Sequence, residues 1–326
     1  MGYSMEILNR ARILLAQHRA DRESELAARQ QQAYAQLPRL REIDMQLRRS
    51  AAKAAQAVFL SGGDAQAAME AVKQENLALQ AERRALVEAN FAPGWLEDNR
   101  CPHCGDTGYV GSSMCHCLKQ LCVQEQRKAL GAIFGGNEGF ENFRLDYYSD
   151  RVDPQLRIAP RAVMEKTLKY CRDYARHFAP GAGNLLLTGG TGLGKTHLAL
   201  AMGRAIGEMG CSVCYESAAG LFGKLEKAKF YPTEEAVLAA KQLENADLLI
   251  IDDLGTEMPG QFVTAALYQL LNQRLMAGKA MIITTNLNVE EAGQRYSAQI
   301  ASRLYGEFTR LTFIGEDIRV KKNKLF

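Results

Sequence analysis

The fold of this chain is decided by Asn184-Leu-Leu-Leu-Thr188, followed by Gly189-Gly-Thr-Gly-Leu-Gly-Lys-Thr196 and His197-Leu-Ala-Leu-Ala-Met202. The first segment is an apolar run of strand length, the second is rich in glycine, and the third has helical composition. In such a strand–loop–helix unit, glycines let successive backbone N–H groups point at phosphates, and the helix N-terminus adds positive potential. The sequence therefore predicts a nucleoside triphosphate site, with ATP as the expected ligand.

The residues of this loop have distinct expected roles. Lys195 is expected to reach the β- and γ-phosphates, and the Thr196 hydroxyl is expected to bind Mg²⁺. The cofactor-binding positions are the whole loop and the histidine after it: Gly189, Gly190, Thr191, Gly192, Leu193, Gly194, Lys195, Thr196 and His197.

Two further apolar segments end in polar residues. Leu248-Leu-Ile-Ile251 is followed by Asp252 and Asp253, and Met281-Ile-Ile-Thr-Thr285 is followed by Asn286. Ligands bind at the carboxyl ends of parallel strands, so these side chains are expected beside the phosphate loop. Asp252 is expected to hold Mg²⁺, directly or through water. Asp253 is expected to orient or activate the attacking water, a role more often filled by glutamate, and its shorter side chain predicts slow hydrolysis. Asn286 is a candidate to hold the lytic water or sense the γ-phosphate, although asparagine after a strand is also a common turn former.

From about residue 160 onward, strand-like and helix-like segments alternate, which predicts a parallel sheet covered by helices. The expected strands are Asn184–Thr188, Cys211–Tyr215, Leu248–Ile251, Met281–Thr284 and Leu311–Ile314. The middle ones are continuous apolar runs, as expected for strands buried on both faces. The fold class expected for this part of the chain is α/β.

A short module ahead of this region is rich in cysteine. Two close pairs flank a glycine-containing stretch, and together they predict a tetrahedral Zn²⁺ site with the ligands Cys101, Cys104, Cys115 and Cys117. Such an ion can supply the folding energy that so small a module lacks. Because C-x-C is a tighter spacing than C-x-x-C, His116 or Cys122 could replace one ligand. The alternative is a loop that carries free thiols.

Residues 4–91 have helical composition, with a single proline and long stretches of alanine, glutamate, glutamine, arginine and leucine. Apolar residues recur at spacings of three and four after Pro38, and again after Asp64, which is a good N-cap. Ser61-Gly62-Gly63 separates the two patterns, so we expect a helical hairpin or small bundle. Self-packing and docking of a partner protein are both consistent with its apolar faces.

The composition of the 326 residues, with 47% hydrophobic and 24% charged residues, is typical of a soluble protein with a real core. A net charge of +3 gives no general argument for nucleic acid, so DNA binding would rest on local patches. No apolar run approaches the roughly 20 residues that span a bilayer, and Met1–Arg22 lacks the apolar stretch of a signal peptide. We expect a cytoplasmic protein without membrane contact, a compartment in which cysteines more often bind metals than form disulfides.

Several of these motifs together resemble the AAA+ ATPases of the bacterial replicative-helicase loader family, of the DnaC/DnaI type. The resemblance rests on Thr188–Leu198, on Ile250-Ile-Asp-Asp-Leu-Gly-Thr-Glu257, on Thr284-Thr-Asn286 and on Ser302-Arg-Leu304. The IstB transposition helpers share this core. Cys101-Pro-His-Cys-Gly-Asp-Thr-Gly-Tyr-Val110 with Cys115-His-Cys117 is similar to the zinc module of DnaI-type loaders.

The resemblance implies further roles. Arg303 matches the arginine finger of this clade, which reaches the γ-phosphate bound by a neighbouring subunit, and Arg319 matches a candidate second sensor of the nucleotide. The family also implies a five-stranded parallel sheet in the order 5-1-4-3-2. A helix-surface arginine is the alternative for Arg303.

The helix after the second strand occupies the place where loaders and initiators carry an element that binds single-stranded DNA. Its lysines and aromatic residues can combine phosphate contacts with base stacking, and the candidate set is Lys224, Lys227, Lys229, Phe230 and Tyr231. A solvated helix face explains the lysines equally well. The tail Lys321-Lys-Asn-Lys324 is a further candidate.

The expected organisation has four parts: a helical partner-binding region over residues 1–95, a zinc-binding module over 96–122, a linker over 123–159 and an AAA+ ATPase domain over 160–326. The expected function is an ATP-dependent loader of the hexameric replicative helicase onto single-stranded DNA, which assembles with itself through the AAA+ domain. Its cofactors would be ATP, Mg²⁺ and Zn²⁺. The alternatives are a transposition or phage replication helper and a nucleotide-dependent adaptor with little hydrolysis.

Overall fold

The computed structural model describes residues 3–60, 65–134, 139–154 and 157–323, and the chain divides into two units. The helical unit is Leu14–Cys115, and the sheet unit comprises Met1–Ile13 and His116–Phe326. No helix in the described part of the chain is long and apolar enough to cross a membrane.

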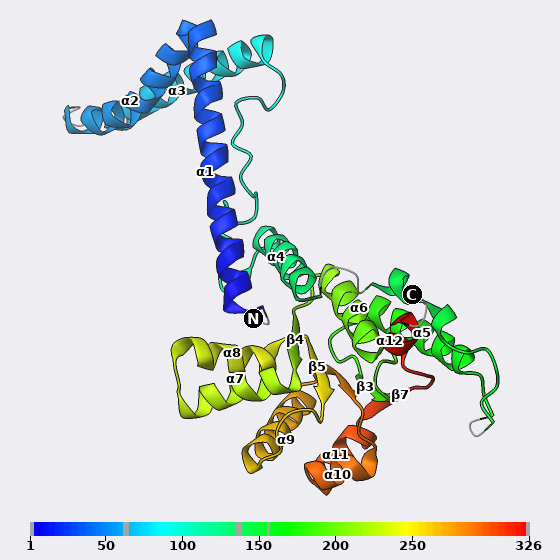
Figure 1. The fold of residues 1–326 in the computed structure, drawn as a ribbon. Helices are drawn as coiled ribbons and strands as arrows, with labels where there is room; N and C mark the ends of the chain where they lie inside the picture. Colours follow the sequence, from blue (N-terminus) through cyan, green and yellow to red (C-terminus); the bar gives the residue numbers. More distant parts are fainter. Residues whose placement is uncertain (1–2, 61–64, 135–138, 155–156, 324–326) are drawn as a thin grey trace. The chain divides into compact units, whose positions relative to one another are not determined.

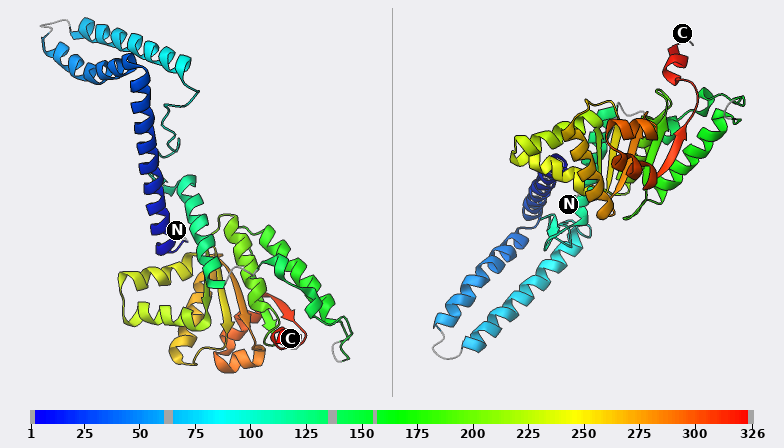
Figure 2. Two further views of the ribbon diagram at one scale, coloured as in Figure 1. Left: turned by 45° about the horizontal axis from the view of Figure 1, so that its top comes forward. Right: turned by 90° about the horizontal axis from the view of Figure 1, so that it is seen from below.

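The helical unit contains three long helices, labelled in Figure 1. They are α1 (Met5–Gln36), whose first turns belong to the sheet unit, α2 (Pro38–Leu60) and α3 (Ala65–Asn90). In Figure 2, α2 and α3 run side by side as a hairpin, with Leu40 and Ile43 fully buried. The turn predicted at Ser61–Gly63 and the N-cap predicted at Asp64 lie outside the described residues. The proline at the start of α2 lacks an N–H that the first turn of a helix would leave unpaired in any case.

A two-stranded antiparallel hairpin, β1 (Tyr109–Val110) and β2 (Ser113–Met114), follows in the cysteine-rich segment. Helix α4 (His116–Phe134) and two short 3₁₀ turns, η1 (Phe140–Asn142) and η2 (Leu145–Tyr147), then lead into the sheet. The chain therefore has regular structure in much of the stretch where the sequence predicted a linker.

The core of the sheet unit is a five-stranded parallel sheet. Its strands are β3 (Asn184–Gly189), β4 (Val213–Ser217), β5 (Leu248–Leu254), β6 (Ala280–Thr285) and β7 (Phe308–Phe313). They lie in the order β4-β5-β6-β3-β7, which confirms the predicted order 5-1-4-3-2 and the α/β fold class.

Helices cover both faces of the sheet. One face packs against α5 (Pro160–Arg176) and α6 (Lys195–Glu208), and the other packs against α7 (Ala218–Phe230), α8 (Glu234–Asn245), α9 (Gln261–Met276) and α11 (Ala298–Gly306). The two remaining helices are α10 (Val289–Arg295) and α12 (Ile318–Asn323). The middle strands are apolar on both faces because each of them lies between two layers of helices.

Strand β5 extends to Leu254 rather than ending at Ile251, and two predicted strand starts were wrong by two or more residues. Strand β4 begins at Val213 rather than Cys211, because the Ser212 backbone N–H and hydroxyl both bond the Asp247 carboxylate, at 2.9 and 2.8 Å. Strand β7 begins at Phe308 rather than Leu311, and its exposed Thr309 and Arg310 hide this edge strand from a search for apolar runs.

One buried charge links α9 to the end of α8 and to the start of β6. Arg274 of α9 is 0% exposed, and its guanidinium donates to four carbonyl oxygens, those of Leu243, Glu244, Ala246 and Ala280, at 2.7–3.1 Å. Three of these carbonyls lie at or beyond the end of α8, where the helix dipole favours a positive charge. Burial lowers the pKa of Arg274 to about 10.

Candidate nucleotide-binding site

The glycine-rich loop runs from the end of β3 to the first residue of α6. Gly192 and Gly194 have φ values of 72° and 84°, in the left-handed region that favours glycine. A Cβ on Gly194 would also lie 2.9 Å from the Phe143 ring. The loop therefore needs glycine at this position both for its backbone conformation and for the close approach of a ring.

Lys195 is almost completely buried at the centre of the loop. Its ammonium donates to the backbone oxygens of Gly189 and Gly190, at 2.9 and 2.7 Å, and to Asn286 Oδ1 at 2.6 Å. Burial lowers the pKa of Lys195, and the nearby Asp252 and Asp253 oppose that shift. The structure thus brings together the lysine and the asparagine that sequence motifs singled out 91 residues apart.

Asp252 lies at the carboxyl end of β5 and is 5% exposed. The Thr196 hydroxyl donates to its two oxygens at 2.9 and 3.2 Å, which joins the two predicted Mg²⁺ ligands. The hydroxyls of Thr284 and Tyr215 also donate to this carboxylate, at 2.6 and 2.8 Å. Burial and the negative charge of Asp252 raise the pKa of Tyr215, so the phenol stays protonated as a donor. The sequence analysis assigned a role to neither residue, although Thr284 belongs to one of its motifs.

Asp253 adopts a positive φ of 53°, which is uncommon for a residue with a side chain. Its N–H donates to the Thr284 hydroxyl at 2.8 Å, and its carbonyl accepts from Thr256 Oγ1 at 2.8 Å. Burial and the neighbouring Asp252 raise the pKa of the Asp253 carboxyl. Asp253 lines the cavity described below, whereas Glu257 is buried elsewhere, bonded to Arg295 and Tyr296.

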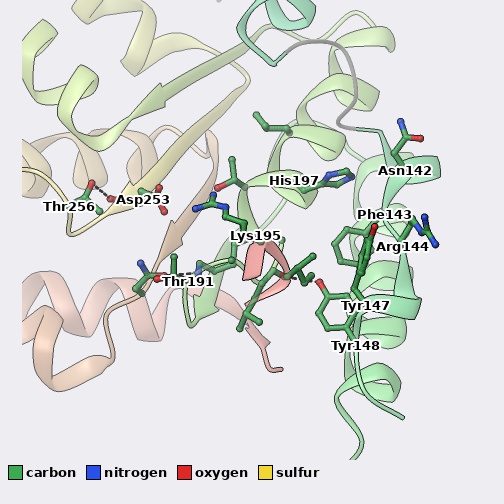
Figure 3. A pocket seen from close by; sticks show the side chains of 18 residues that line it. Asn142, Phe143, Arg144, Tyr147, Tyr148, Thr191, Lys195, His197, Asp253 and Thr256 are labelled. Carbon is green, nitrogen blue, oxygen red and sulfur yellow. Dashed lines mark hydrogen bonds between the residues drawn. The ribbon is translucent and has the colours of Figure 1, made fainter. Parts of the chain in front are cut away.

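A cavity of about 560 Å³ adjoins the loop (Figure 3). Figure 3 shows Phe143, Tyr147 and Tyr148 on one side of it and Asp253 and Thr256 on the other, with Lys195 between them. The full lining is Asn142, Phe143, Arg144, Tyr147, Tyr148, residues 191–197, Leu200, Asp253, Thr256, Asn286, Ile318 and Arg319. Among the predicted cofactor-binding positions, Gly189 and Gly190 are not part of this lining.

The aromatic segment before α5, which contains Phe143 and Tyr148, contacts the glycine-rich loop and the first turn of α6. The Tyr148 hydroxyl donates to the Leu193 carbonyl at 2.8 Å, and the Phe143 ring centre lies 5.4 Å from that of His197. His197 Nε2 in turn lies 2.9 Å from the Gly139 carbonyl. The sequence prediction assigned this segment to a linker, although its clustered aromatic residues were a signal that something packs there.

The two arginines implied by the family resemblance lie in different places. Arg319 lines the cavity, and the Ile318 N–H beside it donates to the Gly192 carbonyl at 3.1 Å. Arg303 on α11 is not part of this lining, and its guanidinium carbon lies 5.4 Å from the centre of the Tyr268 ring. That position fits a role toward a neighbouring subunit, and the role stays a prediction.

The donor set fits a nucleotide and its metal ion. Glycine backbone and a buried ammonium suit phosphate oxygens, while a hydroxyl and a carboxylate in contact suit Mg²⁺, which prefers oxygen ligands. Lys195, now bonded to carbonyl oxygens, has acceptors that phosphate oxygens can replace. The aromatic rings of the cavity provide flat apolar surfaces of the kind that nucleobases stack on.

Four cysteines of the preceding segment form a second candidate site. The sulfur atoms of Cys101, Cys104, Cys115 and Cys117 all lie within 4.8 Å of one another, and those of Cys101 and Cys115 are 3.7 Å apart. Tetrahedral Zn²⁺ with Zn–S bonds of about 2.3 Å requires sulfur atoms about 3.8 Å apart, so the cluster fits this ion. Cys122, considered above as an alternative ligand, is buried in α4, where burial raises its pKa to about 11.

The structure also orients this cluster through a buried carboxylate of the helical unit. Asp106, 6% exposed and with φ of 65°, accepts from the Cys101 N–H at 3.0 Å and is paired with Arg22 of α1. Arg22 donates further to the Asn99 carbonyl at 3.2 Å. Helix α1 thus fixes the turn that presents the first two cysteines.

The predicted DNA contacts lie on the last turns of α7 and just after it. Lys227, Lys229, Phe230 and Tyr231 are exposed, whereas Lys224 forms an ion pair with Glu216. The Phe230 ring stacks at an angle on Phe262 of α9, and the Lys229 ammonium lies 5.5 Å from both ring centres. The sequence analysis did not predict that Phe262 packs beside these residues. The side chains of the predicted tail contacts, residues 321–324, lie outside the described residues.

A parallel sheet in this order, with a phosphate loop after one inner strand and an acidic pair near the carboxyl end of another, defines an ATP-binding P-loop domain of the AAA+ class. Residues 164–324 match the family model of IstB-like ATP binding proteins. This part of the chain is therefore similar to IstB-like ATP binding proteins, whose core the resemblance included.

Relatives come from two groups. A proposed ATP-binding protein of insertion sequence IS21 from Pseudomonas aeruginosa is 30% identical over 152 residues, which are 45% of this chain and 56% of that protein. The chain thus spans about half the length of this relative. The replicative helicase loader DnaC of Buchnera aphidicola (subspecies Baizongia pistaciae) is 25% identical over 190 residues, 57% of this chain and 70% of that protein. A crystal structure of the DnaC helicase loader aligns with a TM-score of 0.44 and 24% identity, over 54% of this chain and 98% of that one.

Proposed function

We propose that this chain is an ATP-dependent loader of the replicative helicase onto single-stranded DNA. The observation that carries the proposal is the four-cysteine cluster, which precedes an ATP-binding domain similar to DnaC loaders and resembles the zinc module of DnaI-type loaders. The similarity to DnaC and the Mg²⁺–ATP donor set support ATP as the energy source.

In the proposed cycle, the loop and Lys195 hold the phosphates, while Thr196 and Asp252 hold Mg²⁺. Bound Mg²⁺ would neutralise the charge that develops on the phosphates during transfer. Phosphate oxygens replace the present acceptors of Lys195, which frees Asn286 Oδ1 to bind the lytic water. Asp253 orients that water, and its raised pKa brings the carboxyl closer to the range of a useful general base.

We also propose that Arg303 completes the site of a neighbouring subunit. It is half-buried beside Tyr268 and away from the cavity of its own chain. Because such an arginine stabilises charge only in the assembled state, hydrolysis would follow assembly on the helicase and DNA. Single-stranded DNA is proposed to contact Lys227, Lys229, Phe230 and Tyr231, with Phe262 as a further stacking surface.

The test is capture of the purified hexameric helicase from the same cell by the full-length protein, with ATP, with ADP and without nucleotide. We expect capture that depends on ATP. The Lys195→Ala variant should lose the nucleotide dependence, while Lys279→Ala, which changes a lysine paired with Asp247 before β6, should keep it. Absence of capture in every nucleotide state would overturn the loader proposal.

A second candidate function is that of a transposition helper. It is favoured by the match to the IstB-like family model and by the 30% identity to the IS21 protein. The same capture experiment separates the two when a transposase encoded beside this protein replaces the helicase. Capture of the transposase alone would favour this second function.

A further inference from the structure

The hydroxyl of Tyr215 contacts the carboxylate that the nucleotide site uses for its metal ion. Strand β4 is paired with β5, and Tyr215 lies two residues before the position opposite Asp252. From there its phenol donates to Asp252 Oδ2 at 2.8 Å. On the other oxygen, the Thr284 hydroxyl of β6 donates at 2.6 Å. Strands on both sides of β5 thus each supply one hydroxyl to the same carboxylate.

The hydroxyls of Tyr215 and Thr284 leave one side of the Asp252 carboxylate facing the phosphate loop. The remaining side-chain donor that the described residues place on Asp252 is Thr196, which belongs to the phosphate loop and is the expected Mg²⁺ ligand. A carboxylate rotates readily about its last bond unless both oxygens are bonded. With a donor from β4 on one oxygen and a donor from β6 on the other, the side chain is fixed while it faces Thr196.

We propose that Tyr215 is a positioning residue for Mg²⁺, which with Thr284 holds the Asp252 carboxylate in its metal-binding orientation. Neutral hydroxyls suit this task better than lysine or arginine would. They bond the buried carboxylate but leave its negative charge to attract the cation. The proposal rests on the Mg²⁺–ATP site alone and does not depend on whether the partner is a helicase or a transposase.

The Tyr215→Phe variant isolates the hydroxyl, because phenylalanine fills the space of the same ring. The measurement is a Mg²⁺ titration of the binding of a fluorescent ATP analogue to the full-length protein. We expect the Mg²⁺ concentration at half-saturation to rise about tenfold, the lower end of the effect of residues that orient metal ligands. Binding of the analogue in EDTA should not change, since the loop and Lys195 still hold the phosphates.

A matched control is available in the same unit. The Tyr296 hydroxyl donates to a different buried carboxylate, Glu257, at 2.6 Å. The Tyr296→Phe variant therefore loses a comparable hydrogen bond and any stability that comes with it, but should keep the Mg²⁺ midpoint. At position 284, Thr284→Ser keeps the hydroxyl and should behave as the unmodified protein, whereas Thr284→Val should shift the midpoint in the same direction as Tyr215→Phe.

An unchanged Mg²⁺ midpoint in Tyr215→Phe would overturn the proposal, as would an equal shift in Tyr296→Phe. Nucleotide binding of the unmodified protein that does not respond to Mg²⁺ would overturn it as well, because no ion would then be positioned. Capture of the helicase by Tyr215→Phe at saturating Mg²⁺ is measured separately. If the unmodified protein does not capture the helicase, the loader function is wrong, but the role of Tyr215 in Mg²⁺ binding is unaffected.

Discussion

The nucleotide site and the four-cysteine cluster are both suited to bind a ligand, but different forces hold them together. Asp252 and Lys195 are buried and already hydrogen-bonded, and they lie at the edge of a sheet that is covered on both faces. The cysteines flank a two-stranded hairpin with two residues per strand, and three of the four are partly exposed. The first site is formed by the fold, whereas the second is expected to need an ion to hold its turns together.

Electrostatics sharpens this difference. In the nucleotide site, Lys195 donates to an amide oxygen and two carbonyls, and Asp252 accepts from hydroxyls, so both charges are hydrogen-bonded. Cysteine, by contrast, binds a metal as the thiolate, and four negative sulfur atoms within 4.8 Å of one another would repel one another without a cation.

Removal of Zn²⁺ is expected to have the largest effect. Structural zinc contributes about 10 kcal/mol or more to the folding of small modules, so chelation should expose Cys101, Cys104, Cys115 and Cys117 to alkylation. Nucleotide affinity should not change. Cys171 and Cys214 should stay unlabelled at pH 8, because burial raises the pKa of each to about 12 and the reactive thiolate forms only as the pH approaches that value.

The measurement is alkylation followed by mass spectrometry, with metal analysis of the same sample. Protein without chelator is the control. Less than one equivalent of metal, or four cysteines that stay protected after chelation, would contradict the zinc assignment.

Completion of the nucleotide site by a neighbouring subunit is tested by mixing two variants. Lys195→Ala should lose ATP hydrolysis, and Arg303→Ala should lose about 10³-fold in rate, the lower end for an arginine finger. In a mixture, an intact Arg303 can face an intact loop of a different chain, so turnover should partly return. Arg310→Ala, at an exposed position on β7, serves as the control. If the mixture is no more active than the two variants alone, Arg303 does not act between subunits.

The stability of the sheet unit should depend on its internal contacts. Arg274→Met removes the donors of four carbonyls, three of them buried, and since each unpaired buried group costs about 1–3 kcal/mol, a loss of roughly 3 kcal/mol or more is expected. Urea unfolding followed by far-ultraviolet circular dichroism measures the change in the free energy of unfolding. Saturating Mg²⁺–ATP should raise the unfolding midpoint of this variant by mass action. A midpoint equal to that of the unmodified protein would show that the buried arginine does not stabilise the unit.

The smallest effect is expected for Asp106→Asn. Asparagine tolerates a positive φ, so the substitution keeps the turn and removes the charge that pairs with Arg22. A loss of about 1.5–3 kcal/mol is expected for a hydrogen bond to a charged group, seen as faster release of Zn²⁺ to a colorimetric chelator. Asp98→Asn is the control, since Asp98 pairs with Arg100 on the surface. Equal release rates for the two variants would mean that Asp106 does not support the metal site.

Features that depend on neighbours along the chain could be predicted from the sequence. The strand, the glycine loop and the helix around Lys195 follow one another directly, and the apolar strand before Asp252 reports its own burial. The four cysteines lie within 17 residues, so their spacing alone predicted the cluster that the structure contains. The fold class and strand order were confirmed, whereas the roles of individual site residues stay predictions.

Features that join distant segments could not be predicted in this way. Tyr148 is 45 residues from the loop carbonyl that it bonds, and Tyr215 is 37 residues from Asp252. The residues around these two tyrosines in the sequence give no sign of the distant groups that they contact. The pairing of Lys224 with Glu216 and the stacking of Phe230 on Phe262 are likewise contacts that no spacing rule specifies.

The sequence by itself determined that this chain has a phosphate loop, a carboxylate at the end of a buried strand and a four-cysteine module. It could do so because backbone conformation, hydrophobic burial and metal-ligand spacing act over a few consecutive residues. Only the tertiary structure decided which side chains surround them: the hydroxyls of Tyr215 and Thr284 on Asp252, the aromatic wall of the cavity, and an Arg303 that lies away from its own site. These depend on how strands are ordered in the sheet and how helices pack across it, and such contacts exist only once the chain has folded.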